Sequence, residues 1–533
     1  MAVARSSVFG KTTAFPSCSV RKISDWRYCE MNMLDRRQFL RLTGAAVVAV
    51  NHLTRAERST KRPNILFCIS DDQTWLHCSA YGSKMVRTPH FDRVAREGVL
   101  FSNAFVSVPS CNPSRSSVLT GMPFYRLKEA SMNHTPWAGA LKVYTDMLAS
   151  EGYHVGFAGK GCGPTDWKAA GRKTNPAGAA YNRHFHQSGS KGISNIDYAR
   201  NFRDFLEKRP KDSPFCFWYG GKDPHRVFKK GIGLREGKKL SDAEVPPFYP
   251  DSPEIRSDLL DYAVHTEWFD EHLGRMLDTL KEIGELDNTL IVVTADNGMP
   301  FPRCKATCYE FGIHMPLAVR WGDRVKPGRV VDDFVSFTDF APTFLEAAGM
   351  PVPRNMTGRS LLPILQSNGS GRIDPNRDHV VVGVERHFPG GRKGGWGYPI
   401  RAIRTEQYLY IQNLAPDRWP VGDPDGPVWP DDDPSGGFGD CDGSPTKTYL
   451  CNHKQDQAYY FDLAFGKRPV EELYDVKKDP YQLRNLADQS RYTKVKMGLA
   501  ARLKEDLIET KDPRAVGKGH ELDDYARKYQ ECL

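Results

Sequence analysis

The sequence predicts an α/β fold: a mostly parallel sheet sandwiched by helices, followed by a smaller α+β domain built on a short antiparallel sheet. Three observations support this prediction. Apolar runs of strand length alternate with helical segments in the first part of the chain. Charged and polar residues recur where those strands end. From about residue 378, short strands follow one another without long helices between them.

The elements of the first part can be placed from apolar pattern and turn residues. Continuous apolar runs such as 63–70 are typical of strands buried on both faces, and glycines such as Gly98 and Gly152 end helices. The predicted strands are residues 63–70, 99–106, 153–158, 214–219 and 289–294. The predicted helices are residues 89–97, 141–150, 196–208 and 254–283.

The second part is predicted to hold strands at residues 379–384, 400–403 and 408–411, and a helix near 495–510. Residues 417–448 are rich in Pro, Gly and Asp, which predicts a long surface loop. We therefore expect three segments: a leader at 1–61, a catalytic domain at 62–377 and a smaller domain at 378–533. No apolar run approaches the ~20 residues that span a bilayer, so we expect no integral membrane protein.

The net charge of +9 does not indicate an anionic partner. Residues 1–62 hold 12 Lys and Arg against 4 Asp and Glu, so nearly all of the excess lies in the leader. We therefore expect no binding to nucleic acid. Hydrophobic residues at 40% and charged residues at 26% are ordinary for a globular chain.

The leader resembles a bacterial twin-arginine export signal. Arg36-Arg37 precede Phe39-Leu40 and a short apolar run at 42–50. The alternative is a basic amphipathic patch. The resemblance implies the twin-arginine translocase as a partner and a periplasmic or secreted bacterial protein. Met31 or Met33 is a candidate start, and the cleavage site stays open.

The 12 cysteines are few for a disulfide scaffold, and no Cys-x-x-Cys pair indicates structural zinc. Two pairs are close enough in sequence to be bonded or free, namely Cys304 with Cys308 and Cys441 with Cys451.

The segment around Cys111 is the strongest candidate for a functional site. Pro113 sits two residues after the cysteine, a favourable place for the first turn of a helix. Cys111 is therefore predicted at a helix N-terminus, where backbone N–H groups and the dipole favour an anion. Arg115, four residues on, can project from the same face. The alternative is a small buried cysteine with no chemical role.

Acidic and amide side chains follow two of the predicted strands. Asp71 and Asp72 come after the strand at 63–70, and Asp296 and Asn297 after the strand at 289–294. Hard oxygen ligands suit Ca²⁺ or Mg²⁺ rather than zinc. Each Asp alone is more often a helix cap or a turn former. Two pairs at the same edge of a sheet favour a metal site.

Cys111-x-Pro-Ser-Arg115 followed by Leu119-Thr120-Gly121 resembles the signature of the formylglycine-dependent sulfatases, which have an alkaline-phosphatase-like fold. The resemblance implies that Cys111 is oxidised to formylglycine by a formylglycine-generating or other sulfatase-maturating enzyme. It also implies a metal site formed by the carboxylates and amide above together with modified Cys111. The same resemblance implies roles in an anion pocket for Lys160, His225 and Lys305, each of which alone would be a solvated or capping residue.

The mechanism implied by this resemblance begins with hydration of the aldehyde to a diol. One hydroxyl, held by Ca²⁺, attacks sulfur, while Arg115, Lys160 and Lys305 neutralise the sulfate oxygens. His225, alone or together with Lys305, protonates the leaving oxygen or nitrogen. The second hydroxyl then expels sulfate and restores the aldehyde.

One position departs from the family pattern. Many relatives carry a histidine two residues after the lysine, where this chain has Cys162. Three histidines are candidates to replace it in space: His154, His184 and His186. A further possibility is that His225 acts alone as the leaving-group acid.

Several segments resemble the heparan N-sulfatases, among them Asp223-Pro224-His225-Arg226 and the run 296–302. This implies a sulfated glycan substrate such as N-sulfoglucosamine, with Glu385, His387 and Arg401 facing the sugar. Ordinary polar residues on a small sheet are the alternative for these three. Two other functions stay open: a phosphate or phosphonate monoester hydrolase of the same superfamily, and a non-catalytic protein that binds sulfated glycans.

Overall fold

The structure is a computed structural model that describes residues 61–186, 193–387, 389–428 and 433–528. From Lys61 onward these residues belong to one compact unit. The twin-arginine segment and the rest of the predicted leader up to residue 60 lie outside the described residues. Among the described residues, no helix has both the length and the apolar character that crossing a membrane requires.

The largest sheet is mostly parallel, as predicted. β1 (Asn64–Ser70) pairs in parallel with β9 (Thr289–Ala295) on one side and with β8 (Phe215–Gly220) on the other. β11 (Leu317–Arg320) is antiparallel to both of its neighbours. In the described part of the chain the order is β12 (Arg329–Val331), β2 (Val99–Phe101), β11, β9, β1, β8, β5 (His154–Gly159) and β7 (Ala179–Ala180).

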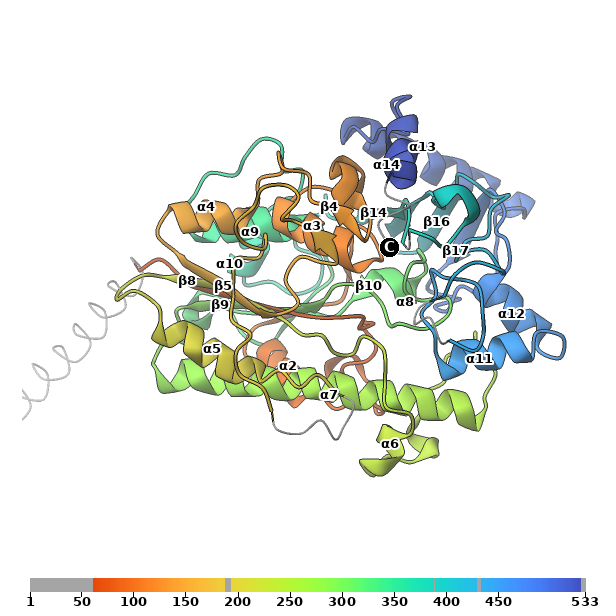
Figure 1. Cartoon of the computed structure of the whole chain (residues 1–533). Helices are drawn as coiled ribbons and strands as arrows, with labels where there is room; N and C mark the ends of the chain where they lie inside the picture. The colour runs from red at the N-terminus through yellow and green to blue at the C-terminus, as the bar shows by residue number, and fades with distance from the viewer. Residues whose placement is uncertain (1–60, 187–192, 388, 429–432, 529–533) are drawn as a thin grey trace, which may run out of the picture. The chain divides into compact units, whose positions relative to one another are not determined.

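Helices cover both faces of this sheet (Figure 1). Alternate side chains of β1 enter different cores: Ile65, Phe67 and Ile69 lie in one, and Leu66 and Cys68 in the other. The first core is closed by α3 (Cys111–Thr120), α4 (Tyr144–Ser150) and α9 (Phe340–Ala347). The second is closed by α2 (Pro89–Arg96), α5 (Tyr198–Glu207) and α7 (Pro253–Glu282).

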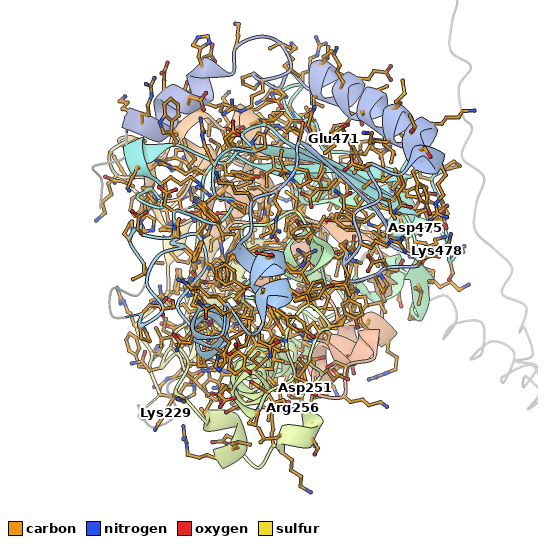
Figure 2. The ribbon with its side chains drawn as sticks, turned by 90° about the vertical axis from the view of Figure 1, so that its right-hand side faces the viewer. Lys229, Asp251, Arg256, Glu471, Asp475 and Lys478 are labelled. Carbon is orange, nitrogen blue, oxygen red and sulfur yellow. The ribbon has the colours of Figure 1, made fainter. Side chains whose placement is uncertain are left out.

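The long helix α7 begins where the sequence predicts. Ser252 caps it by accepting a hydrogen bond from the backbone of Ile255, and Pro253 occupies the first turn. Asp251 and Arg256, labelled in Figure 2, form an ion pair at this end of the helix.

The predicted strand at 99–106 is in fact two strands in different sheets. After β2, the strand β3 (Ala104–Phe105) pairs with β10 (His314–Met315) and β13 (Val335–Ser336). The residues between β2 and β3 turn the chain because Ser102 and Asn103 both bond Asp332, at 2.6 and 2.9 Å. These polar contacts are not visible in the apolar pattern of the segment.

The small antiparallel sheet of the second part is confirmed. Its order is β14 (His379–Val384), β15 (Ile400–Thr405), β16 (Tyr408–Asn413) and β17 (Glu471–Asp475). Glu471, at one end of β17 in Figure 2, accepts a hydrogen bond from Tyr410 and pairs with Lys496 on α13 (Thr493–Glu509), both at 2.7 Å. The division into domains near residue 377 stays a prediction.

The prediction of a surface loop at 417–448 is wrong for its later part. There Asp440 and Asp442 are buried, and Lys447 is fully buried. Further elements that the sequence did not predict are α6 (Ile232–Arg235), α8 (Glu310–Ile313), α10 (Leu362–Gln366), α11 (Pro445–Asn452), α12 (Ala458–Phe465), α14 (His520–Lys528), β4 (Thr135–Pro136) and β6 (Thr165–Asp166). The two candidate disulfide pairs, Cys304 with Cys308 and Cys441 with Cys451, are free thiols.

Candidate active site

The acidic residues that follow β1 and β9 meet at the carboxyl edge of the main sheet. The backbone N–H of Asp72 donates to Asp296 Oδ1 at 2.9 Å. The amide of Asn297 donates to Asp72 Oδ1 at 2.7 Å. Asp71, Asp72, Asp296 and Asn297 are all buried. Parallel pairing of β1 with β9 explains this meeting, because both strands end at the same edge.

Cys111 is the first residue of α3 and faces this acidic cluster. Ser110 is the N-cap, and Cys111 Sγ lies 3.9 Å from Asp72 Oδ1. Burial raises the pKa of the Cys111 thiol, and the nearby Lys160 and Lys305 offset this only in part. A reactive thiol needs a lowered pKa. Unmodified Cys111 is therefore a poor nucleophile.

Arg115 is fully buried beneath the cluster and binds its carboxylates. Its Nε donates to Asp296 Oδ2 at 2.7 Å, and its Nη2 lies 3.6 Å from Asp71 Oδ1. Its Nη1 donates to the carbonyl of Lys160 at 2.8 Å. The guanidinium thus fixes two carboxylates and the end of β5 together. Its contact with a sulfate oxygen stays a prediction.

Two lysines bind different carboxylates of the cluster. Lys160 Nζ donates to both oxygens of Asp71 at 2.7 Å, and its side chain is 17% exposed. Lys305 Nζ lies 2.8 Å from Asp72 Oδ2 and 2.9 Å from Asp442 Oδ2. Burial alone would lower the pKa of each lysine, but the carboxylates raise both. Both side chains are held as cations.

His225 faces the same carboxylates from the segment after β8. Its Nδ1 donates to the carbonyl of Arg226 at 2.6 Å, and its Nε2 lies 3.7 Å from Asp72 Oδ2. Arg226 is in turn paired with Asp258 on α7 at 2.8 Å. Nδ1 is therefore the donor to a backbone carbonyl, and Nε2 is the ring nitrogen that faces the carboxylates.

The oxygen donors of the cluster are of the kind that a divalent cation binds. Burial raises the pKa of Asp71, but Lys160, His225 and Arg115 outweigh this and lower it. Burial raises the pKa of Asp296 to about 7; Arg115 opposes that rise and the nearby Asp71 adds to it. Asn297 Oδ1 is buried and has no hydrogen-bond partner in the described structure. An all-oxygen set with one unpartnered carbonyl fits a hard divalent cation.

None of the three histidines considered from the sequence takes the place of the histidine that many relatives have at the position of Cys162. Cys162 Sγ lies 3.5 Å from Ser116 Oγ and from Asn112 Oδ1. His154 stacks on Phe205, and the backbone of His184 bonds Asn201. His186 lies 3.8 Å from Asp197. In the described contacts, none of the three histidines touches Cys111 or the acidic cluster.

Of the three residues predicted to face a sugar, His387 lies beside Cys111. Its Nδ1 is 2.8 Å from Ser110 Oγ, and Asn133, which bonds the same hydroxyl, is 3.3 Å from this nitrogen. Burial, followed by the charge of Lys305, lowers the pKa of His387 to about 4. His387 is therefore neutral at pH 7.

Glu385 and Arg401 lie in a buried ion-pair network instead. Arg401 Nη2 bonds Glu385 at 2.6 Å and Asp512 at 3.1 Å, and Arg514 pairs with Glu385 at 2.6 Å. This arrangement favours a structural role for both residues. Their contact with sugar stays a prediction.

Three functional candidates were missed by sequence reasoning. Asp442 pairs with Lys305, Asn133 donates to Ser110, and His265 on α7 bonds Asp223 at 2.7 Å. Asp442 and Asn133 stand in segments without regular periodicity, so nothing local marked them. In the structure His265 lies beside the Asp-Pro-His segment. The one signal available in the sequence was a histidine on the buried face of a predicted helix.

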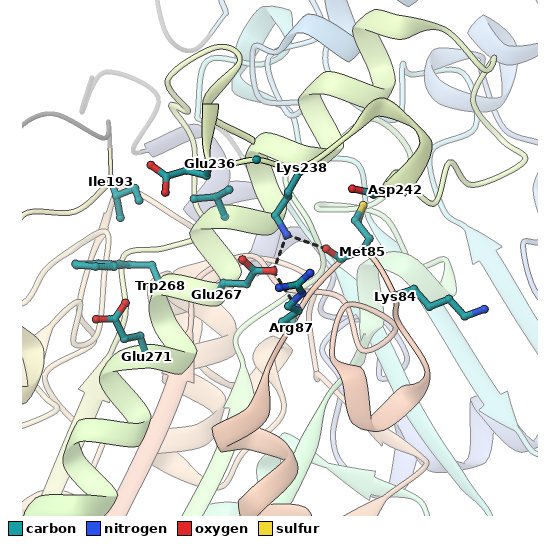
Figure 3. Close-up of a pocket in the computed structure, with 12 residues that line it drawn as sticks. Lys84, Met85, Arg87, Ile193, Glu236, Lys238, Asp242, Glu267, Trp268 and Glu271 are labelled. Carbon is teal, nitrogen blue, oxygen red and sulfur yellow. Dashed lines mark hydrogen bonds and ion pairs between the residues drawn. The ribbon is translucent and has the colours of Figure 1, made fainter. Parts of the chain in front are cut away.

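The molecule also has a cavity of about 410 Å³ that includes none of these residues (Figure 3). Its wall includes Trp268 on α7, and Lys238 there pairs with Glu267 at 2.6 Å. Charges of both signs lie around it, so it has no clear preference for an anion.

Comparison with known families identifies the class of protein. A family model described as Sulfatase matches residues 63–350, more than half of the chain. A second model, described as N-sulphoglucosamine sulphohydrolase, C-terminal, matches residues 304–421. The chain belongs to the sulfatase family and is a sulfuric ester hydrolase. The resemblance seen in the sequence is confirmed.

Named relatives share between a quarter and a third of their residues with this chain. Human N-sulphoglucosamine sulphohydrolase is 29% identical over 500 residues, covering 84% of this chain and 91% of that protein. An ulvan-active sulfatase of Formosa agariphila is 28% identical over 450 residues, covering 83% and 80%. N-acetylglucosamine-6-O-sulfatase of Bacteroides thetaiotaomicron is 27% identical over 549 residues, covering 86% and 88%.

Solved structures confirm the alkaline-phosphatase-like fold. One, determined in complex with its substrate D-glucosamine-2-N,6-O-disulfate, has a TM-score of 0.61 at 22% identity and covers 85% of this chain and 99% of that chain. The phosphonate monoester hydrolase of Agrobacterium radiobacter has a TM-score of 0.57 at 18% identity, covering 84% and 96%. At these identities the likeness concerns the fold alone.

Proposed function

We propose that this sulfatase removes sulfate from sulfated glucosamine and that N-sulfoglucosamine is its preferred substrate. The reaction would use a formylglycine made from Cys111 and a bound Ca²⁺. The observation that carries the proposal is the buried acidic cluster that faces Cys111 at the start of α3. The match of residues 304–421 to the C-terminal model of N-sulphoglucosamine sulphohydrolase supports the choice of sugar.

Asp71, Asp72, Asp296 and Asn297 would hold the cation, with residue 111 as a further ligand. Oxygen donors favour Ca²⁺ or Mg²⁺ over zinc, and the choice of Ca²⁺ follows the family resemblance. Formylglycine would supply a hydrated aldehyde, with one hydroxyl as the nucleophile for sulfur and a second hydroxyl that allows sulfate to be released. Because Cys111 is buried, the maturation enzyme would have to act on the chain before it folds.

The cationic side chains would bind and neutralise the sulfate. Lys160 is the partly exposed one, so its ammonium is best placed to meet the incoming anion. Arg115 and Lys305 are buried and bind the carboxylates of the cluster, so they would add their positive charge to the site from there. Fixed cations in a site closed to water stabilise charge that develops in the transition state.

His225 is the best candidate for the leaving-group acid. Its Nδ1 proton is committed to the carbonyl of Arg226, so Nε2, which faces the acidic cluster, is the nitrogen that would carry the proton for the departing oxygen or nitrogen. His387 is less suited, because its lowered pKa of about 4 leaves it neutral and its Nδ1 is engaged by Ser110. His387 would instead contact the sugar.

Export completes the proposal. The twin-arginine segment at 35–50 would direct the chain through the twin-arginine translocase to the periplasm or beyond. That route carries folded proteins, which agrees with modification of Cys111 in the cytoplasm.

The deciding assay measures sulfate release by the full chain, co-expressed with a maturation enzyme. Faster release from N-sulfoglucosamine than from 6-O-sulfated N-acetylglucosamine would support the proposal, and the reverse order would overturn the choice of N-sulfate. Matched nitrophenyl sulfate and phosphate test the reaction class, and faster phosphate turnover would favour the monoester hydrolase. Mass analysis of the Cys111 peptide completes the test: an unmodified thiol and no turnover would favour a glycan-binding protein.

A further inference from the structure

Lys305 is held between two carboxylates that come from distant parts of the chain. Its Nζ is 2.8 Å from Asp72 at the end of β1 and 2.9 Å from Asp442, which lies just before α11. The Lys305 side chain is 4% exposed and that of Asp442 is 8% exposed. An ammonium buried this deeply is stable only while it is paired.

The segment that carries Asp442 is fixed from within. Lys447, fully buried, donates through Nζ to Asp433 Oδ2 at 2.8 Å and to the carbonyl of Cys441 at 3.1 Å. Asp440 pairs with Arg392 at 2.7 Å. These contacts lie on both sides of position 442, so its carboxylate is presented to Lys305 from a rigid support.

The two partners of Lys305 are not equivalent once a cation is bound. Asp72 belongs to the proposed metal site, so a divalent cation would take much of its charge and repel the ammonium beside it. Asp442 lies outside that set, and the charge closest to it is Lys305 at 2.9 Å, with His225 and His387 as weaker partners. The ammonium has three donors, and in the described contacts the two carboxylates use two of them, which leaves one for the substrate anion.

We propose that Asp442 is a positioning residue: it holds Lys305 in the anion site and keeps its ammonium from competing with the cation for Asp72. This inference rests on the proposed function, because it presumes that a cation binds at Asp72. It assigns a role to a segment that the sequence alone indicated to be a surface loop.

The test is the affinity of the full chain for Ca²⁺, measured by calorimetry with no substrate present. Asp442→Asn should weaken binding at least tenfold, because Lys305 then relies on Asp72 alone. Asp425→Asn removes the same charge from an exposed position of the same loop and should leave affinity unchanged. Adding Lys305→Met to Asp442→Asn should restore affinity to at least the wild-type value.

Activity gives a second measurement. In Asp442→Asn, kcat for sulfate release should fall at least tenfold with KM within threefold of wild type, whereas Asp442→Glu should recover most of kcat. If Asp442→Asn fails to fold, Lys305→Met alone decides: loss of the competing ammonium should tighten Ca²⁺ binding at least threefold. An unchanged or weaker affinity in that variant would overturn the inference.

The possible failures are distinguishable. If the wild-type chain binds no Ca²⁺, the proposed calcium site is wrong and this inference falls with it. If the wild type binds Ca²⁺ and releases sulfate but Asp442→Asn binds Ca²⁺ equally well, the proposed function stands and only the role of Asp442 is overturned.

Discussion

Substitution of Arg401 tests whether this residue has a structural role or contacts the sugar. Its guanidinium is 1% exposed, bonds Glu385 and Asp512, and lies 4.9 Å from the ring of Phe124. In Arg401→Met the side-chain volume is nearly kept, so the main loss is the charge. Asp512, which is fully buried, would then face the interior without its guanidinium partner.

The expected loss of unfolding free energy can be bounded from the contacts that Glu385 and Asp512 keep in this variant. Removing one partner of a buried ion pair costs about 3–5 kcal/mol of unfolding free energy, because an uncompensated charge is left behind. Here Glu385 keeps Arg514 at 2.6 Å, and Asp512 keeps the backbone N–H of Arg514 at 3.0 Å. We therefore expect the lower end, about 3 kcal/mol.

The assay is urea unfolding followed by tryptophan fluorescence, with the concentration of divalent cation held constant because a bound ligand shifts apparent stability. Lys393→Met is the control: its ion pair with Asp425 is fully solvated and its loss should leave the midpoint unchanged. A folded Arg401→Met protein with unchanged stability and a raised KM would refute the structural role and favour the sugar contact.

Three further predictions concern the site and the pH dependence. Cys111→Ala should fold normally, release no sulfate and lose labelling by a hydrazide probe that detects the aldehyde. Lys160→Met should lower kcat/KM about 10²-fold or more, because a fixed cation in the anion pocket is lost. Burial lowers the pKa of His77 to about 4 and that of His272 to about 3, so both are neutral when folded. Unfolding then takes up protons below about pH 6.5, and stability should fall by about 2–3 kcal/mol per histidine between pH 7 and pH 4.5. The urea midpoint should show this fall, and it should be smaller in His272→Gln.

The strand ends that carry the chemistry could be predicted because they follow from simple periodicity. Buried parallel strands are marked by continuous apolar runs, and residues just after them must lie at one edge of the sheet. That rule alone brings Asp71, Asp72, Asp296 and Asn297 together, as observed. The start of α3 at Cys111 follows equally from Pro113, which occupies the first turn.

The rest of the site could not be predicted because its partners are long-range and polar. Asp442 is 137 residues from Lys305 in sequence, and Glu385 is 129 residues from Arg514. Composition suggests that an Asp-rich, Pro- and Gly-rich segment is solvated, yet it cannot show which carboxylates meet a buried cation. The predicted surface loop failed in its later part for this reason: Asp433, Asp440 and Asp442 are buried and paired with Lys447, Arg392 and Lys305.

The same reasoning explains why the second part of the chain belongs to the site. The acidic cluster and its Arg115 come from the main sheet and α3, but Lys305 is balanced by Asp442 and Ser110 is bonded by His387. The acids and bases at the sheet edge already pair with one another. The remaining partners, Asp442 for Lys305 and His387 for Ser110, therefore come from later segments of the chain. We therefore expect substitutions at Asp442 and His387 to alter catalysis as strongly as those on the sheet, whereas substitutions around Arg401 should alter stability. We expect that division, rather than the boundary near residue 377, to separate the functional part of the smaller region from its structural part.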